Sequence, residues 1–463
     1  MANAIELRGK RVLVVGLART GVATALFCAT RGASVTCTET RLEGEIGDPI
    51  ARLRAAGINL ELGGHREQIL LHQDLVIPSP GVPGDAPLLR AARARGITIW
   101  SEIELAARFL SGRLIGITGS NGKTTTTSLI EHVLRSAGFP TILAGNIGTP
   151  LISCVGQTND KSITVVELSS FQLELIETFR PNISVFLNLT PDHLDRHRTF
   201  DSYGSAKARI FENQTEADSA VLNADDPATA ALAPSRPQVY WFSRKQGVTQ
   251  GAFVCGNEIV FRRDGADETV LKLADIPLVG AHNIENVLAA VAVTRLAGAD
   301  PAAIAKGVRS FSGVEHRLEF VAEIGGVRYY NDSKATNVDA TLKALDAFSG
   351  RILIILGGKD KGSDYTVLQV PLREKAILAL LIGAAADKIE KQIAGSVAIE
   401  RAGTMERAVE TASHAARPGD IVILAPACAS FDQFQNYEHR GRVFKGLVHQ
   451  LERQAASSTF GVR

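Results

Sequence analysis

The chain has 463 residues, and at roughly 100–200 residues per domain this length predicts two to four domains. Apolar residues make up 45% and charged residues 21%, so we expect large cores and no long disordered tract. Lys and Arg number 50 against 49 Asp and Glu, a net charge of +1. This balance gives no whole-chain argument for binding nucleic acid or an anionic membrane.

The N-terminal sequence and the apolar runs predict a cytoplasmic protein without membrane insertion. MANAIELRGKRVLVVG lacks the pattern of a signal peptide, and no run reaches the roughly 18 apolar residues that a membrane-spanning helix needs. The cysteines favour neither a disulfide framework nor a structural zinc site, because their number is odd, their spacing wide and no CxxC pair occurs. We expect most of them to be small buried residues in a reducing compartment: Cys28, Cys37, Cys154, Cys255 and Cys428.

The first hundred residues alternate short β-branched runs with an alanine-rich helical stretch. Strands are predicted at 11–16, 34–40, 74–81 and 97–102, and a helix at 21–32. This alternation is typical of a parallel sheet covered by helices. We therefore predict an N-terminal Rossmann-like domain over residues 1–101.

A second α/β unit follows, and a third begins near Gly313. Residues 113–138 predict a strand, a glycine loop and a helix, and further strands are expected at 162–170 and 183–190, hairpin strands within 251–273 and a buried helix at 280–298. The third unit opens with a hairpin that turns at Gly325-Gly326 and continues with strands at 351–358, 376–383 and 420–427. The prediction is an α/β protein of three domains: 1–101, a central P-loop-type ATPase domain with a mostly parallel sheet at 102–312, and a C-terminal Rossmann-like domain at 313–463.

The segment Gly119-Ser120-Asn121-Gly122-Lys123-Thr124 has the composition of a phosphate-binding loop between a strand and a helix. Small residues let backbone N–H groups approach phosphate oxygens. Lys123 can neutralise the β- and γ-phosphates, and the Thr124 hydroxyl can ligate Mg²⁺. The segment departs from the strict P-loop at Ile117, where that pattern has glycine. It predicts an enzyme that uses ATP with magnesium.

Polar residues follow the next two predicted strands of the same unit. Glu167 comes directly after the β-branched run 163–166 and is a candidate metal ligand. Residues 188–195, which include His193, follow the next strand at the sheet edge where open α/β sheets bind ligands. The alternative for His193 is a helix-capping or core histidine. Because magnesium prefers oxygen ligands, a histidine ligand is chemically unusual, and spacing alone does not assign His193 to the metal.

A second glycine turn, Gly16 to Gly21, lies after the first strand and resembles GxGxxG with Ala18 in the middle position. Glu39 lies at a spacing that suits a contact to a ribose hydroxyl. The turn fits a dinucleotide oxidoreductase, another nucleotide ligand or a tight turn without a ligand. Ser79-Pro80-Gly81 adds another loop of small residues at the same edge.

Taken together, these segments resemble the Mur ligase family over nearly the whole chain. The segment TGSNGKT is typical of the family, whereas DSKATN and PACASFDQF indicate its glutamate-adding branch. The residues that carry the resemblance are 116–126, 144–148, 166–174, 189–197, 206–210, 280–286, 315–319, 330–337, 356–365 and 425–441.

The resemblance implies three domains that bind a UDP-sugar, ATP and an amino acid. It implies an ATP-dependent amide ligase of peptidoglycan precursor synthesis, and hence of cell-wall biogenesis, cell shape and cell division. Its substrates would be UDP-N-acetylmuramoyl-L-alanine, D-glutamate and ATP. The enzyme would join the first two through an acyl phosphate formed with ATP, and it would act as a monomer. The ligand at the first glycine turn would then be uridine diphosphate.

The resemblance also assigns roles to residues at matching positions. Lys123, Glu167, His193 and Lys207 would be catalytic, and two Mg²⁺ ions would bind at Thr124, Glu167, His193 and a carbamylated (N6-carboxylated) Lys207. From sequence alone, Lys207 is better explained as an ordinary exposed helical lysine. ATP would contact Gly119, Ser120, Asn121, Gly122, Lys123, Thr124, Thr125, Asn283, Asn286, Arg317 and Asp332.

The remaining implied contacts concern the other two substrates. The UDP-substrate would contact Leu17, Arg19, Thr20, Glu39, Thr40, Arg41, Ser79, Pro80, Gly81, Asn146, Ser169 and Gln172. D-Glutamate would contact Lys334, Thr336, Lys361, Ser430, Phe431 and Tyr437. Lys359 is an alternative to Lys361, and Phe431 stands where a smaller aliphatic residue is expected.

Three other functions compete with this interpretation. A sibling Mur-type or folylpolyglutamate-type ligase would add a different amino acid. A dinucleotide-dependent oxidoreductase would use the turn at Gly16–Gly21 but leaves Lys123 and Glu167 unexplained. A non-catalytic nucleotide-binding protein would bind ATP without substrate-dependent turnover.

Overall fold

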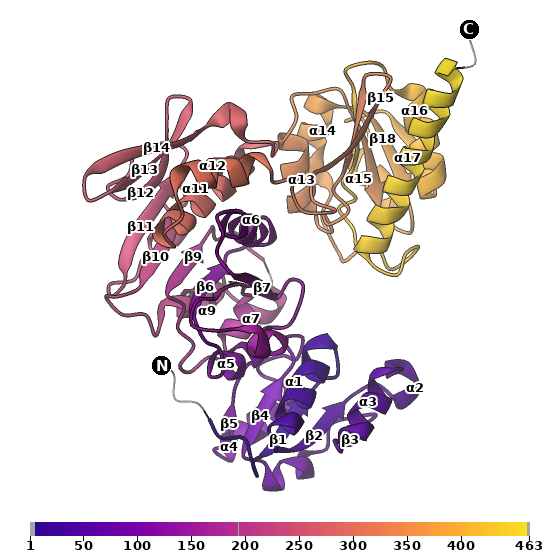
Figure 1. Ribbon diagram of the computed structural model, residues 1–463. Coiled ribbons are helices and arrows are strands. Elements are labelled where there is room, and N and C mark those ends of the chain that lie inside the picture. The colour runs from indigo at the N-terminus through magenta and orange to yellow at the C-terminus, as the bar shows by residue number, and fades with distance from the viewer. Residues whose placement is uncertain (1–4, 193, 461–463) are drawn as a thin grey trace. The chain divides into compact units, whose positions relative to one another are not determined.

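The computed structural model describes residues 5–192 and 194–460, and its chain divides into two compact units (Figure 1). The first unit comprises Met1–Asp275 together with Glu285–Phe311. The second comprises Ile276–Ile284 together with Ser312–Arg463. Each unit is built on parallel strands whose apolar side chains are buried beneath helices.

The N-terminal part of the first unit is a five-stranded parallel sheet in the order β3-β2-β1-β4-β5. Val12 and Val14 of β1 are buried on one face, and Leu13 and Val15 on the other, because successive strand residues point to opposite sides. The strands are β1 Arg11–Val15, β2 Ser34–Glu39, β3 Asn59–Leu62, β4 Leu75–Pro78 and β5 Thr98–Ile99. The helices are α1 Arg19–Thr30, α2 Glu43–Ile46, α3 Pro49–Ala55, η1 Glu67–His72, α4 Pro87–Ala94 and α5 Glu102–Ala107.

The central part of the first unit holds a nine-stranded sheet in the order β14-β13-β12-β11-β10-β9-β6-β8-β7. Its strands run parallel from β7 to β12, and β12, β13 and β14 form an antiparallel meander. The strands are β6 Arg113–Thr118, β7 Thr141–Gly145, β8 Ile163–Glu167, β9 Ile183–Phe186, β10 Ser219–Asn223, β11 Gln238–Ser243, β12 Gly251–Cys255, β13 Glu258–Arg263 and β14 Ala266–Lys272. The strand β6 lies inside the sheet, and its carboxyl end therefore faces loops from both neighbours.

The helices around this sheet include α11, of which the part from Glu285 onward belongs to the first unit. They are α6 Lys123–Ser136, η2 Leu151–Gln157, α7 Ser170–Leu173, α8 Leu194–His197, α9 Phe200–Ala208, η3 Arg209–Phe211, α10 Pro227–Ala230, η4 Leu273–Asp275, α11 Ala281–Leu296 and α12 Pro301–Arg309. Residues Val287–Val293 of α11 are almost fully buried, which confirms the buried helix predicted at 280–298.

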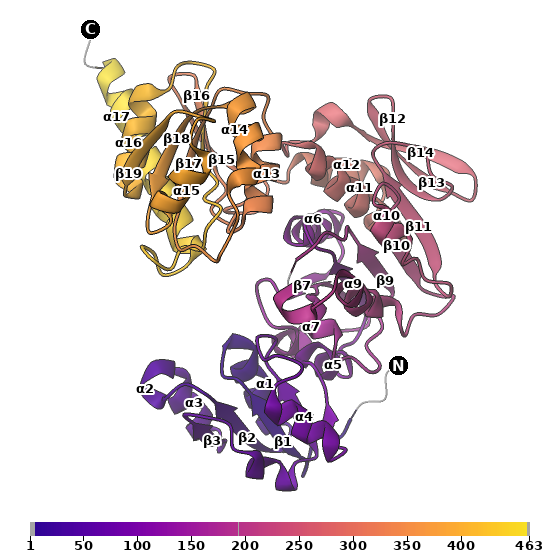
Figure 2. The same cartoon turned by 180° about the vertical axis from the view of Figure 1, so that it is seen from behind.

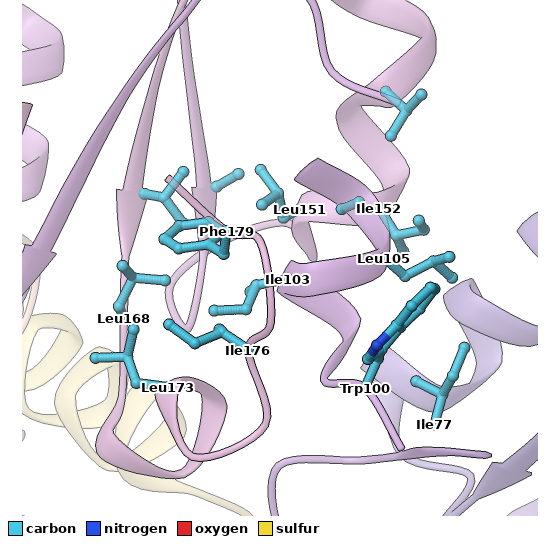
Figure 3. Packing of buried hydrophobic residues seen from close by; sticks show 14 of the residues in the cluster. Ile77, Trp100, Ile103, Leu105, Leu151, Ile152, Leu168, Leu173, Ile176 and Phe179 are labelled. Atoms are coloured by element: carbon cyan, nitrogen blue, oxygen red, sulfur yellow. The ribbon is translucent and has the colours of Figure 1, made fainter. Parts of the chain in front are cut away.

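A continuous apolar cluster joins the N-terminal sheet to the central sheet (Figure 3). Trp100 lies between Ile77 of β4 and Leu105 of α5, and the cluster extends to Phe179 before β9. The carboxylate of Glu104 is buried beside it and accepts hydrogen bonds from the backbone N–H groups of residues 177, 178 and 179. The cluster and this carboxylate fix the N-terminal sheet to the central one.

The second unit contains a six-stranded sheet in the order β15-β16-β20-β17-β18-β19, in which only the edge strand β15 is antiparallel. The strands are β15 Glu319–Ile324, β16 Val327–Asn331, β17 Ile352–Gly357, β18 Ala376–Ile382, β19 Ile399–Gly403 and β20 Ile421–Leu424. The helices are α13 Val338–Asp346, η5 Thr366–Leu368, α14 Gln369–Lys375, α15 Ala386–Ile393, α16 Met405–Ala415 and α17 Tyr437–Phe460.

Helices cover both faces of this third sheet (Figure 2). Ile352, Ile354 and Leu356 of β17 pack toward α13, α14 and α15, whereas Leu353 and Ile355 pack toward α16 and α17. Since both faces are buried, the strand reads as one continuous apolar run.

The structure confirms the predicted α/β class with mostly parallel sheets and the hairpin that turns at Gly325-Gly326. Sequence analysis missed β3, β7, β10, β11 and β19. Three of these strands (β3, β7 and β19) lie at sheet edges, where fewer side chains are buried and the apolar signal is weak. Four of the five cysteines are buried, and Cys255 is exposed. Within the described residues, no helix is long and apolar enough to cross a membrane. The domain boundaries at 101 and 312 stay predictions.

Candidate active site

The phosphate loop connects the carboxyl end of β6 to the first residue of α6. Gly119 and Gly122 have φ angles of 148° and 82°, a region that glycine adopts readily. A Cβ at Gly119 would lie 3.0 Å from Cβ of Leu187, and one at Gly122 would collide with Oδ1 of Asn286. Both positions combine a positive φ with a close neighbour, so a side chain at either one would be strained. The loop leads directly into a helix N-terminus that suits an anion.

The end of β9 holds this loop in place through Asn188. Its Oδ1 accepts from the Asn121 N–H at 2.8 Å, and its Nδ2 donates to the Asn121 carbonyl at 3.1 Å. The Ser120 N–H donates to the Asn188 carbonyl at 2.9 Å, and the Ser120 hydroxyl donates to the Thr190 carbonyl at 2.9 Å. The shape of the loop is thus fixed by hydrogen bonds before any ligand arrives.

Thr124 and Glu167 meet at the base of the loop, as the sequence analysis required. The Thr124 hydroxyl donates to Oε2 of the buried Glu167 at 2.9 Å, and Nδ2 of Asn146 donates to Oε1 at 3.0 Å. A hydroxyl and a carboxylate oxygen are hard ligands of the kind that Mg²⁺ takes beside substrate phosphates. These two residues fit a magnesium ion bound together with a nucleotide.

Two lysines converge on the same loop. Nζ of Lys123 donates to the carbonyls of Gly119 and Ser120, both at 2.8 Å. Lys207 of α9 is 2% exposed, and its Nζ donates to the Gly119 carbonyl at 2.8 Å. Burial, with Lys123 nearby, holds the pKa of Lys207 well below its usual range, and Asp192 and Glu167 oppose that shift. The interpretation of Lys207 as an exposed helical lysine is wrong, because α9 turns this residue inward against the loop that follows β6.

The N-terminal glycine turn is packed against the Ser79-Pro80-Gly81 loop. Gly16 has φ 90°, and a Cβ there would lie 3.1 Å from Cβ of Ser79, whose hydroxyl donates to the Gly16 carbonyl at 2.9 Å. Glu39 is buried and accepts from the backbone N–H groups of Leu17, Thr40 and Arg41. Burial opposes its ionisation, but these bonds and the Arg41 side chain hold the pKa of Glu39 at about 2. Glu39 therefore shapes the turn through its backbone contacts.

Arg196 links this loop to the central sheet. Its Nη1 and Nη2 donate to the carbonyls of Pro80 and Val82, both at 3.0 Å, and its guanidinium lies 3.7 Å from the ring centre of Phe171. Ser169, immediately before α7, forms a capping box with Gln172. One cavity is lined by Ser79, Pro80, Gln172 and Arg196. Two segments predicted to contact the UDP-substrate, 79–81 and 169–172, therefore lie next to each other.

Within the second unit, a cluster of polar residues gathers around Arg317. Asp332 is buried and accepts from the Leu318 N–H at 3.3 Å; burial raises its pKa to about 6, while Arg317 opposes the shift. Burial and the positive charges of Arg317 and Lys343 lower the pKa of His282 to about 4. Asn283, one residue later, donates from Nδ2 to the Val279 carbonyl at 2.7 Å. Two of the predicted ATP residues of this unit, Arg317 and Asp332, are therefore neighbours.

The predicted amino-acid contacts lie on loops at the carboxyl edge of the third sheet. Lys334 and Thr336 follow β16, Lys361 follows β17, and Ser430 and Phe431 follow β20. Nζ of Lys334 lies 5.7 Å from the ring centre of Tyr437. Ser430 is buried, whereas Phe431 is 66% exposed. Lys359 and Lys361 are both exposed, and the choice between them stays a prediction.

The structure thus brings together the phosphate loop, Thr124, Glu167, Asn146, Lys207 and Asn286 in the first unit. Asn286 is buried and accepts from the Thr126 hydroxyl at 3.1 Å. His193 lies outside the described residues. Asn188 begins the polar segment 188–195 that was predicted at the sheet edge, but no role was assigned to it. Three further residues lie inside segments that carried the family resemblance, and no local pattern marked them individually: Arg196, His282 and Arg440.

Family models match three successive parts of the chain. The model described as "Mur ligase MurD-like, N-terminal domain" matches residues 10–101, "Mur ligase middle domain" matches 117–294 and "Mur ligase, glutamate ligase domain" matches 316–428. A UDP-N-acetylmuramoylalanine–D-glutamate ligase from Koribacter versatilis is 54% identical over 451 residues, which cover 97% of this chain and 99% of that protein.

The chain belongs to the Mur ligase family. A second UDP-N-acetylmuramoylalanine–D-glutamate ligase, from Acidobacterium capsulatum, is 54% identical over 447 residues, or 96% of this chain and 97% of that protein. The fold resembles a crystal structure of MurF ligase from Thermotoga maritima in complex with ADP, with a TM-score of 0.60 and 18% identity over 98% of each chain. The three-domain α/β fold implied by the sequence resemblance is confirmed.

Proposed function

We propose that this Mur ligase family member joins D-glutamate to the L-alanyl carboxylate of UDP-N-acetylmuramoyl-L-alanine at the expense of ATP, in peptidoglycan precursor synthesis. The observation that carries the proposal is identity of 54% over nearly the full chain to two ligases of that name. The site supports it independently, since a phosphate loop, a buried carboxylate and a buried lysine meet at one sheet edge.

The reaction requires activation of the L-alanyl carboxylate, because oxide is a poor leaving group. That carboxylate attacks the γ-phosphorus of ATP, so that ADP leaves and an acyl phosphate forms. The D-glutamate amine then attacks the acyl carbon, loses a proton, and inorganic phosphate leaves as the amide forms. Catalysis of this kind depends on alignment and on neutralising phosphoryl charge.

The residues of the first unit would divide this work. The backbone N–H groups at the N-terminus of α6 and Nζ of Lys123 would hold the phosphates. Lys123 would exchange its bonds to the loop carbonyls for bonds to phosphate oxygens. Thr124 and Glu167 would hold Mg²⁺. When bound, the ion would neutralise phosphate charge. Asn286 would lie on the adenine side. Among the residues of the second unit, Asn283 would also contact the adenine, Arg317 the phosphates and Asp332 the ribose.

Lys207 is proposed to carry a carbamate. Carbon dioxide adds only to a neutral amine, and burial of Lys207 favours the neutral form. The addition replaces a cation by an anion beside Lys123, which relieves the repulsion between the two lysines. The carbamate oxygens could then join His193 at a second magnesium ion. Labelling with ¹³C-bicarbonate and detection of a carbamate carbon signal, absent from Lys207→Arg, would test this.

The other two substrates are assigned to the loops described above. The uridine diphosphate would lie at the N-terminal end of α1 and along Ser79-Pro80-Gly81, with Asn146 near the sugar-peptide end. D-Glutamate brings two carboxylates, which favour cations and hydroxyls; Lys334, Lys361, Thr336 and Ser430 supply these groups. The chain is proposed to act as a cytoplasmic monomer.

Phosphate release measures the proposed reaction directly. ATP, Mg²⁺, UDP-N-acetylmuramoyl-L-alanine and D-glutamate are supplied together, and each is then omitted in turn. Release that needs all components, with a product heavier by one glutamyl residue, is expected. Turnover with another amino acid instead would assign the chain to a sibling ligase. ATP binding without substrate-dependent release would reject the ligase function.

A further inference from the structure

Arg440 is the largest fully buried side chain in the described part of the protein, with an exposed fraction of 0%. It lies in the first turn of α17, where the helix dipole disfavours a cation. Among the described residues, no carboxylate forms an ion pair with it. Burial lowers its pKa to about 10, so it is still charged at neutral pH, and Cys428 and Asp432 oppose the shift. Burial of a charged side chain without an ionic partner destabilises the folded protein, so stability does not explain the position of Arg440.

The guanidinium instead donates to the backbone and hydroxyl oxygens of two loops. Nη2 and Nε donate to the carbonyl and hydroxyl of Ser333, at 2.8 and 3.0 Å. Nη1 donates to the Cys428 carbonyl at 3.1 Å. The Ser333 hydroxyl in turn donates to the Tyr437 carbonyl at 2.8 Å. Arg440 therefore joins the loop after β16, the loop after β20 and the start of α17.

A third loop, after β17, closes around the same group. A Cβ at Gly358 would lie 3.2 Å from Nη1 of Arg440 and would collide with the Ala429 carbonyl. The next residue, Lys359, pairs with Ala429 through backbone hydrogen bonds at 2.8 and 3.2 Å. The strands β16, β20 and β17 are neighbours in the sheet, so Arg440 lies where their three carboxyl ends meet.

A chain of polar contacts extends this linkage from the buried Cys428 and Tyr365 to the partly exposed Asp360, the residue before Lys361. The Tyr365 hydroxyl donates to Oδ1 of Asp360 at 2.8 Å and lies 3.0 Å from Sγ of Cys428. Nζ of Lys388 donates to Oδ2 of Asp360 at 2.8 Å. Burial opposes ionisation of Asp360, but the bonds from Lys388 and Tyr365 hold its pKa at about 2. The carboxylate is thus a fixed acceptor that anchors the loop.

We infer that Arg440 is a positioning residue for the amino-acid substrate: it fixes the three loops that carry Lys334, Lys361 and Ser430. This inference rests on the proposed function. Arg440 itself is fully buried and does not touch D-glutamate. The three loops must hold two carboxylates and present one amine, and a guanidinium fork fixes several oxygens at once where a lysine would fix fewer.

The test measures the Michaelis constants for D-glutamate and for UDP-N-acetylmuramoyl-L-alanine in Arg440→Lys and Ser333→Ala. Arg440→Lys should raise KM for D-glutamate about 30-fold, because it removes hydrogen bonds that hold the loops in place. Ser333→Ala removes one hydroxyl and should raise it about fivefold. KM for UDP-N-acetylmuramoyl-L-alanine should not change, because its predicted contacts lie in the first unit. Ser333→Ala keeps the test available where Arg440→Lys does not fold.

The matched control is Arg442→Lys, an exposed arginine two residues along the same helix, for which all constants should equal those of the unaltered protein. Equal rises in the D-glutamate and UDP-substrate constants, or an unchanged D-glutamate constant in both variants, would overturn the inference and leave Arg440 a structural residue. Failure of the unaltered protein to consume D-glutamate would instead reject the proposed function.

Discussion

Asn188 offers a direct test of how the phosphate loop is shaped. Its side chain makes two hydrogen bonds to the backbone of Asn121, at 2.8 and 3.1 Å. Asn188→Ala removes both and leaves the Asn121 N–H and carbonyl without these partners. At about 1 kcal/mol net for each bond, the loss is about 2 kcal/mol, or about 30-fold in an equilibrium constant. We expect ATP affinity to fall by that factor, because the loop must now be ordered by the ligand.

Titration calorimetry with a non-hydrolysable ATP analogue and Mg²⁺ measures the effect. Asn213→Ala is the matched control, since Nδ2 of Asn213 also makes two hydrogen bonds, at 3.0 and 3.1 Å, to the carbonyls of Glu177 and Phe179. It should lower the melting temperature without changing ATP affinity. The reasoning would be refuted by an affinity of Asn188→Ala within about twofold of the unaltered protein, a difference of about 0.4 kcal/mol, or by equal losses in both variants.

Three further changes test other parts of the first unit. Gly122→Ala should reduce ATP affinity by about tenfold or more, because the new methyl group would clash with Oδ1 of Asn286 and because the residue has a positive φ. The calorimetric titration described above measures this affinity. An unchanged affinity would contradict the packing argument. Arg196→Met removes the hydrogen bonds to the Pro80 and Val82 carbonyls. It should raise KM for the UDP-substrate about tenfold and leave KM for ATP unchanged. Equal rises in both constants would contradict a role of Arg196 in shaping the UDP-substrate site. Burial raises the pKa of Glu104, but the hydrogen bonds that its carboxylate accepts from the backbone outweigh burial, so the pKa is lowered overall. The stabilisation by this carboxylate is therefore present above the unfolded pKa of about 4.3. It is lost as the pH falls through the pKa of the folded state. Glu104→Gln should therefore lower the melting temperature at pH 7 and weaken its decline in acid; an unchanged melting profile would show that this carboxylate is dispensable.

Local sequence was enough to predict those functional groups that directly follow a predicted strand. The run Ile163–Glu167 predicted a carboxylate at the end of a strand, and GSNGKT predicted a phosphate loop at the end of another. Parallel strands bring their carboxyl ends to one edge, so the contact between Thr124 and Glu167 at 2.9 Å follows from topology. The family resemblance carried the substrate assignments, which position along the chain alone leaves open.

Tertiary structure decided which polar residues are buried and what they hold. The sequence pattern predicts an exposed Lys207, whereas in the structure α9 turns this residue toward the phosphate loop. A helix has a solvent face and a core face, and only the neighbouring elements determine which is which. No local pattern assigns a role to Asn188, Arg196 or Arg440, since each acts on backbone oxygens or N–H groups of segments remote in sequence. The sequence therefore predicted the groups that would contact the ligand. The residues that hold those groups in place were identified only in the tertiary structure, because they act between segments that are far apart along the chain.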